Sequence, residues 1–158
     1  MRRTASILAL VLPLVLLAGS TAAAGAQAPQ GRTYFVWVMG LNDDTYDADV
    51  DCLTFDATEA CSSDGEVCLA WQRAEGGVQA RKQSGFSFET EIDDDGLIIT
   101  MDGQGRVDDR GKGSSISMVA RAAALDLQLN FVVSGRQARR SRCLRMVEDF
   151  YAARAGGR

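Results

Sequence analysis

The stretch from Gly85 to Gly103 constrains the fold of this chain most, because its apolar and polar residues alternate regularly. The apolar set is Phe86, Phe88, Thr90 and Ile92 before a DDDG sequence, and Leu97, Ile99 and Met101 after it. A period of two indicates strands that bury one face, and Asp-Gly between two such runs indicates a hairpin turn. We therefore predict a β-hairpin with one apolar and one acidic face, which needs a second apolar layer to pack against.

Two registers of this hairpin keep the same residues on the apolar face. A two-residue loop at Asp95-Gly96 places Glu89 opposite Asp102, whereas a four-residue loop over 93–96 does not. Like charges directly opposite each other destabilise a strand pair. We therefore predict the four-residue loop, unless a cation lies beside the two carboxylates.

Residues 1–26 have the composition of a cleaved secretory signal peptide. Arg2 and Arg3 precede an apolar run over 7–18, and Ala24-Gly25-Ala26 supplies small residues for cleavage. The run is shorter than the roughly 20 apolar residues that span a bilayer, although an alanine-rich extension leaves a membrane anchor as the alternative. We expect an exported protein, in the bacterial periplasm or outside the cell, with residues 27–158 as one domain.

Four cysteines lie in the predicted exported part: Cys52, Cys61, Cys68 and Cys143. An even number of cysteines in an oxidising compartment predicts disulfides. Cys52 alternates with acidic residues and is expected to point inward, and Cys143 lies on the apolar stripe of a predicted helix. We expect Cys143 to pair with Cys52 or Cys61, and the pattern does not decide between them. The chain has no C-x-x-C pair and no histidine, which disfavours zinc, and we expect no metal and no cofactor.

Further strands are predicted by apolar runs and by alternation. They cover residues 33–41, 47–52, 66–73, 78–83, 115–124 and 125–133, with a polar loop over 57–65 and a glycine-rich loop over 103–115. The spacing over 115–124 also fits a helix, and we prefer a strand because the residues that follow alternate strictly. Helical spacing of apolar residues predicts an amphipathic helix over 137–153. The fold class is therefore all-β, a small antiparallel barrel or sandwich of seven to eight strands with one C-terminal helix. This outline is similar to the lipocalin type of barrel at the level of fold alone, because Phe35 and Val36 stand before Trp37 where that family has G-x-W.

The chain contains no histidine, which excludes catalysis by a histidine base and metal sites built on imidazole. Motifs of other hydrolases and of phosphate-binding loops are missing as well. A net charge of −4 disfavours a nucleic-acid partner. We therefore expect a binding protein rather than an enzyme.

Five aromatic residues would share one interior if the strands close on themselves: Trp37, Trp71, Phe86, Phe88 and Phe131. Core packing is the simplest role for these rings. The functional alternative is a cavity, since a barrel of about eight strands can hold one small molecule. A small apolar or amphipathic ligand in the barrel interior is the leading hypothesis.

The second hypothesis is a protein-binding module, such as an inhibitor of a basic hydrolase, that acts through an acidic face over 42–66. The segment between Arg32 and Arg73 holds nine acids and no base. The candidate partner-binding acids are Asp43, Asp44, Asp47, Asp49 and Asp51. The same acids could serve solubility alone.

Five arginines gather where the C-terminal helix begins: Arg136, Arg139, Arg140, Arg142 and Arg145. The dipole of a helix disfavours positive charge at this end. We expect these arginines to contact the chain's own acidic segment. The alternative partner is an anionic membrane surface, with Arg139 and Arg140 as the candidate residues.

Overall fold

The computed structural model describes residues 29–41, 48–74, 83–109 and 113–157. The predicted signal peptide over 1–26 lies outside the described residues, and so do Asp43, Asp44 and Asp47 and most of the predicted strand over 78–83.

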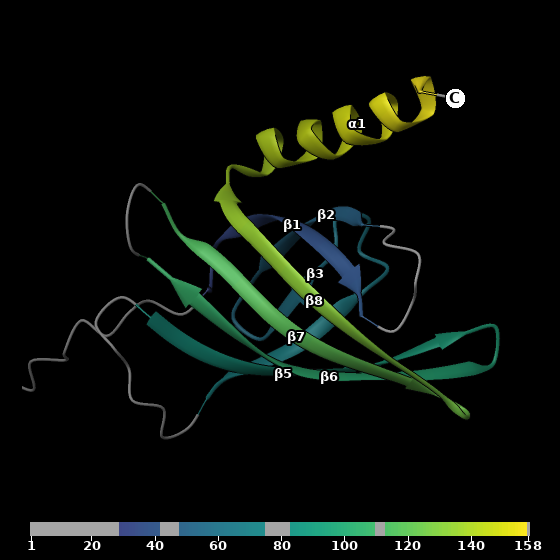
Figure 1. Ribbon diagram of the computed structural model, residues 1–158. Helices are drawn as coiled ribbons and strands as arrows, with labels where there is room; N and C mark the ends of the chain where they lie inside the picture. Colours follow the sequence, from purple (N-terminus) through teal and green to yellow (C-terminus); the bar gives the residue numbers. More distant parts are fainter. Residues whose placement is uncertain (1–28, 42–47, 75–82, 110–112, 158) are drawn as a thin grey trace, which may run out of the picture.

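Eight antiparallel strands form a closed barrel in which each strand pairs with its neighbours in sequence, and β8 pairs with β1 (Figure 1). The strands are β1 Thr33–Gly40, β2 Asp49–Phe55, β3 Glu59–Cys61, β4 Cys68–Arg73, β5 Gln83–Asp94, β6 Leu97–Asp108, β7 Ser115–Ala124 and β8 Leu127–Ala138. The helix α1, Arg140–Gly156, packs outside the barrel against β1 and β2. The predicted class is confirmed, and the architecture is a barrel rather than a sandwich.

Aromatic rings fill the middle of the barrel. Tyr34, Phe55 and Phe86 are the largest fully buried side chains. The rings of Tyr34 and Phe55 meet edge to face at 5.8 Å between centroids, and those of Phe55 and Phe86 at 5.5 Å. Such arrangements add to the stabilisation from burial alone. The alternation seen in the sequence therefore places a packed aromatic core inside the barrel.

The turn between β5 and β6 has two residues, so the predicted four-residue loop is wrong. Asp95 and Gly96 have φ of 50° and 85°, as a tight hairpin turn requires. Glu89 therefore lies opposite Asp102. On the next strand Arg121 lies opposite Asp102, with its Nη2 3.4 Å from a carboxylate oxygen. This cation offsets the repulsion between the two acids, which is the condition for the shorter loop.

The predicted glycine-rich loop from residue 103 is instead the second half of β6. A Cβ at Gly103 would lie 2.4 Å from the ring of Phe88, and one at Gly105 would lie 2.2 Å from the ring of Phe86. Glycine is a poor strand former in general, which is why the pattern indicated a loop. Here the missing side chains make room for the aromatic core.

The helix begins at Arg140 rather than at residue 137, because β8 continues to Ala138, which pairs with Thr33. Cys52 points away from the barrel interior and toward α1, which corrects its predicted inward orientation. It is buried there, at 1% exposure, beside Phe35 and Val50. The helix thus covers a second, smaller apolar cluster on the outer face of the barrel.

Two disulfides are formed, as predicted. Cys52 bonds to Cys143 and fastens α1 to β2, and Cys61 bonds to Cys68 and links β3 to β4. Disulfides persist in oxidising environments, which indicates a location outside the cytoplasm. Within the described ranges, no helix combines the length and apolar character needed to cross a bilayer.

The two disulfides should contribute unequally to stability. Cys52 and Cys143 are 91 residues apart in sequence, whereas Cys61 and Cys68 are 7 apart, and the entropy removed from the unfolded chain grows with loop length. We expect the double variant Cys52→Ala/Cys143→Ala to lose about 2 kcal/mol more free energy of unfolding than Cys61→Ala/Cys68→Ala. Urea denaturation of both variants, each with its remaining disulfide oxidised, measures this difference. Equal losses would contradict the expectation.

Candidate ligand site at the apolar end of the barrel

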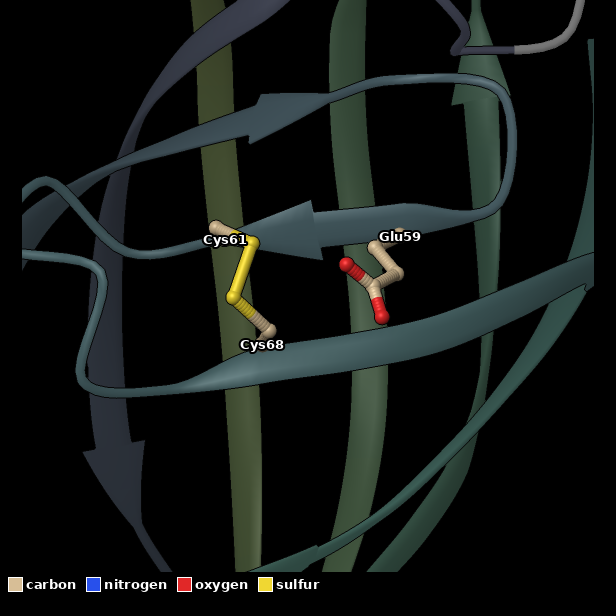
Figure 2. A group of neighbouring side chains, drawn as sticks. All are labelled: Glu59, Cys61 and Cys68. Atoms are coloured by element: carbon tan, nitrogen blue, oxygen red, sulfur yellow. A yellow bond between two sulfur atoms is a disulfide. The ribbon is translucent and has the colours of Figure 1, made fainter.

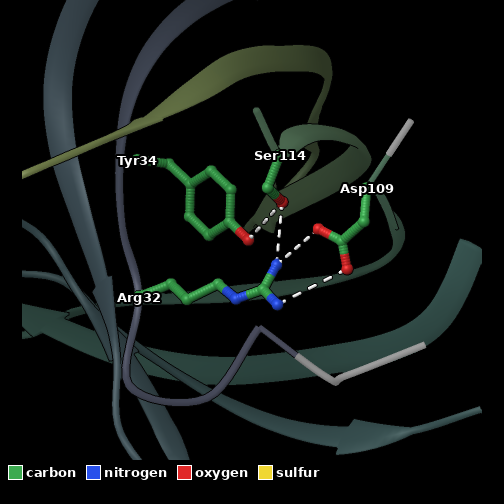
Figure 3. A network of polar contacts seen from close by, with 4 residues as sticks. All are labelled: Arg32, Tyr34, Asp109 and Ser114. Carbon is green, nitrogen blue, oxygen red and sulfur yellow. Dashed lines mark hydrogen bonds and ion pairs between the residues drawn. The ribbon is translucent and has the colours of Figure 1, made fainter. Parts of the chain in front are cut away.

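One end of the barrel is sealed by a polar network around Arg32 (Figure 3). Nη1 of Arg32 donates to a carboxylate oxygen of Asp109 at 2.6 Å and to the hydroxyl of Ser114 at 2.9 Å. The hydroxyls of Ser114 and Tyr34 are 3.1 Å apart and share a hydrogen bond. Tyr34 is fully buried and Ser114 nearly so. These polar groups therefore satisfy one another at this end of the interior, which we call the sealed end.

Asp109 and Arg32 each stabilise the charged form of the other. Burial opposes ionisation of Asp109, but hydrogen bonds from Arg32 and Ser114 outweigh it and hold the pKa of the carboxyl below its usual value. The hydrogen bond with Asp109 in turn raises the pKa of the Arg32 guanidinium. The ion pair is therefore fully formed at neutral pH.

The opposite end of the barrel is apolar where the structure describes it, and we call it the barrel mouth. It is formed by half-buried side chains that pack against the interior core: Val38, Val67, Met101 and Phe131. The β5–β6 and β7–β8 hairpins extend beyond the other strands at this end (Figure 1). They continue the inward-facing apolar series with Ile99 and Leu129, both half-buried. The mouth thus has an apolar rim and an apolar approach.

Trp71 lies on β4 opposite Phe88, which is opposite Gly103, two residues along β6 from Met101 of the mouth. Its ring is 9% exposed and lies 5.9 Å from that of Phe55 and 6.2 Å from that of Phe86. Its indole Nε1 is buried, and no hydrogen-bond acceptor for it is found among the described residues. A buried donor without an acceptor costs about 1–3 kcal/mol, so such groups usually bond to water or to a ligand. Trp71 therefore brings an unsatisfied donor into an apolar interior.

The structure brings four of the five predicted interior aromatics together. Trp71, Phe86 and Phe88 belong to the buried interior cluster, and Phe131 packs against it. Trp37 does not, and its predicted interior position is wrong. It lies on the outer face, 37% exposed, with its ring 4.7 Å from that of Phe35. The strand β1 is apolar on both faces, so alternation could not show which face is interior.

Two of the predicted partner-binding acids are used within the chain. Asp49 accepts a hydrogen bond from the hydroxyl of Tyr151 on α1. Asp51 accepts main-chain N–H bonds from Cys52 at 2.6 Å and from Ser63 at 3.2 Å. These two carboxylates therefore hold the helix and the loop before β4 in place.

The β3–β4 hairpin brings Glu59 close to Cys61 and Cys68 (Figure 2). Carboxylate and thiolate groups at this spacing would suit a metal ion. Both sulfurs are bonded to each other, however, so neither is available as a thiolate ligand. The disulfide between Cys61 and Cys68 is a covalent link between β3 and β4.

A groove of about 610 Å³ lies over the outer face of β4–β8, and sequence reasoning missed it. Its polar lining includes Gln72, Ser87, Glu89, Asp102, Gln104 and Arg121. These are the outward-facing positions of the alternating pattern, which were visible in the sequence. The curvature that gathers them was not, because it depends on how the strands coil around the barrel.

The chain matches no known protein family, no curated protein and no solved structure.

The sealed end should make the stability of the protein sensitive to acid through Asp109. The folded-state pKa of Asp109 is depressed below its unfolded value of about 3.9. The ionised carboxylate therefore adds stability above that value, and this stability is lost as the pH falls through the folded-state pKa. We expect Asp109→Asn to lower the free energy of unfolding by about 1–3 kcal/mol at neutral pH, with a smaller difference from wild type below about pH 4.

Urea denaturation from neutral pH to about pH 3 measures this change. The matched control is Asp126→Asn, at an exposed position in the β7–β8 turn, which should change little at any pH. A loss in Asp109→Asn that stays constant over the whole range would contradict the assignment.

Proposed function

We propose that this protein is an exported, non-enzymatic binding protein that holds a small amphipathic ligand at the barrel mouth. The observation that carries the proposal is the buried indole N–H of Trp71, which lacks an acceptor among the described residues. The rings of Tyr34, Phe55 and Phe86 occupy the interior below it, so a ligand would sit at the mouth and not in the depth of the barrel. Its compartment would be the periplasm or the exterior of the cell.

The chemistry of the mouth indicates the class of ligand. Val38, Met101 and Phe131 offer an apolar surface, and Met101 adds a flexible thioether that adapts to different shapes. Trp71 offers one neutral donor, which suits a carbonyl, ester or hydroxyl oxygen. The expected ligand is therefore an apolar body with a single acceptor oxygen.

The proposal is one of binding alone. Among the described residues, the four that form the mouth carry no acid, base or nucleophile. Histidine is missing from the whole chain. A ligand held by these side chains would be stored, carried or sensed without chemical change.

The second candidate is a protein-binding module that acts through the acidic β2–β4 region. Asp56 accepts main-chain N–H bonds from Thr58 and Glu59 at 2.8 and 2.6 Å, and Asp64 accepts one from Glu66 at 3.0 Å. The Thr58 amide lowers the pKa of Asp56, and the Ser62 hydroxyl lowers that of Asp64. Both carboxylates are thus ionised and fixed in position before a basic partner arrives, which favours binding.

Native mass spectrometry of the protein purified from its own host separates the two candidates. Extra mass that leaves as an organic molecule on mild denaturation supports a ligand carrier and identifies the ligand. A bare polypeptide mass, together with failure of the binding measurement that follows, would favour the protein-binding module.

Substitution of Trp71 should weaken binding of a neutral fluorescent ester, methyl cis-parinarate, at the mouth. Trp71→Phe keeps an aromatic ring but removes the donor, and one hydrogen bond corresponds to roughly a 2- to 12-fold change in affinity. The matched control is Trp37→Phe, on the outer face, which should leave the affinity unchanged. Titration of the probe followed by its fluorescence measures both. An equal loss in the two variants, or no saturable binding by the wild-type protein, would overturn the proposal.

A further inference from the structure

The arginines at the start of α1 form a cationic surface that has no partner in the described part of the chain. We call this the arginine surface, and its members are Arg136, Arg139, Arg140, Arg142 and Arg145. All five are exposed, and the ion pairs found among the described residues involve Arg32 and Arg121 instead. The expected contact with the chain's own acidic segment is therefore not made within its described part, residues 48–66.

These arginines do not stabilise the helix. Arg139 occupies the N-cap without a capping hydrogen bond from its side chain, and the first turn contains no acidic residue. Positive charge is disfavoured at this end of a helix. Arg142 and Arg145 lie one turn apart on the same side, where like charges repel. The arrangement is thus unfavourable unless an anion approaches from outside.

Other contacts hold α1 on the barrel. The disulfide from Cys143 to Cys52 fixes its first half. Its second half is held by Tyr151, whose hydroxyl bonds to Asp49 and to the main-chain oxygen of Val50. The arginine surface is therefore displayed by a scaffold that does not depend on it.

A hollow adjoins the arginine surface at the junction of β8 and α1. It has a volume of about 580 Å³, and its lining is Gly31, Arg32, Thr33, Gly113, Gln137, Ala138, Arg139 and Arg140. A guanidinium donates two parallel hydrogen bonds and so matches the geometry of a phosphate. Two such groups beside a hollow can hold phosphate oxygens.

We propose that the arginine surface binds the phosphate groups of an anionic phospholipid bilayer and orients the barrel on it. Charge complementarity with lipid phosphates carries the inference, because five exposed guanidinium groups without an ion-pair partner among the described residues lie within ten residues at the start of α1, in a chain whose net charge is −4. The exposed acids of the β2–β4 region, among them Asp56 and Glu59, are repelled by the same bilayer. The protein therefore binds with one face and not with the rest of its surface.

Vesicle co-sedimentation tests this with the full, disulfide-bonded chain. One set of vesicles contains equimolar phosphatidylglycerol and phosphatidylcholine, and the other contains phosphatidylcholine alone. We expect stronger binding to the anionic set and release of the protein by added salt. Each arginine near such a surface contributes about a fivefold increase in binding, so Arg139→Glu/Arg140→Glu should reduce it by at least about 25-fold.

The matched control is Arg73→Glu/Arg106→Glu, which makes the same change in charge at two exposed barrel positions. It should keep binding within about threefold of wild type, because most of the local attraction remains. Residues 1–28 are common to all three proteins, so their contribution cancels in the comparison. Circular dichroism checks that each variant is folded.

Three outcomes would overturn the proposal. The first is equal binding of the wild-type protein to both sets of vesicles. The second is an equal loss in the control, which would assign the effect to net charge. The third is anionic-vesicle binding that survives high salt in the Arg139→Glu/Arg140→Glu variant, which would assign it to apolar insertion elsewhere in the chain.

Discussion

The packing of the barrel depends on glycines that leave room for aromatic rings and for the main chain of neighbouring strands. On β6 the rings of Phe88 and Phe86 occupy the space where Cβ atoms of Gly103 and Gly105 would lie. On β8 a Cβ at Gly135 would lie 2.4 Å from the main-chain oxygen of Phe35. A side chain at Gly103 or Gly135 would collide with the main chain of the neighbouring strand, and one at Gly105 would displace the ring of Phe86. Because β8 can approach β1 this closely, the sheet closes and leaves no unpaired edge.

Closure of the barrel then divides its interior into two unlike ends. At the sealed end, buried polar groups of Arg32, Tyr34 and Ser114 bond to one another and to Asp109. At the mouth, one buried donor on Trp71 has no acceptor in the described chain and its neighbours are apolar. A satisfied network specifies a unique structure. An unsatisfied buried donor, in contrast, favours binding, because a ligand that supplies an acceptor lowers the free energy of the complex. The difference between the two ends is the physical reason to place binding at the mouth.

Sequence alone predicted the parts of this fold that follow from local alternation. The period of two placed Phe86, Phe88, Trp71 and Phe131 on inward faces, and the change of period placed the helix after the last strand. The predicted interior position of Trp37 was wrong, because the alternation in a strand that is apolar on both faces does not indicate which face is interior.

The other features that the sequence did not predict depend on contacts between residues that are distant in sequence. The register of the β5–β6 hairpin depends on Arg121, which reaches Asp102 from another strand. The strand around Gly103 depends on a ring from β5. The missing acceptor of Trp71 is likewise a property of the packed interior and not of any short stretch of sequence.

The two proposed sites lie at opposite ends of the molecule, and this relates their functions. Arg136 pairs in register with Phe35 and Ser115, next to the Ser114 hydroxyl of the sealed end. The arginine surface therefore adjoins the sealed end, and the mouth opens at the other. With the arginine surface on a bilayer, the mouth would face the aqueous phase. The two proposed sites could therefore be occupied at the same time, because neither covers the other.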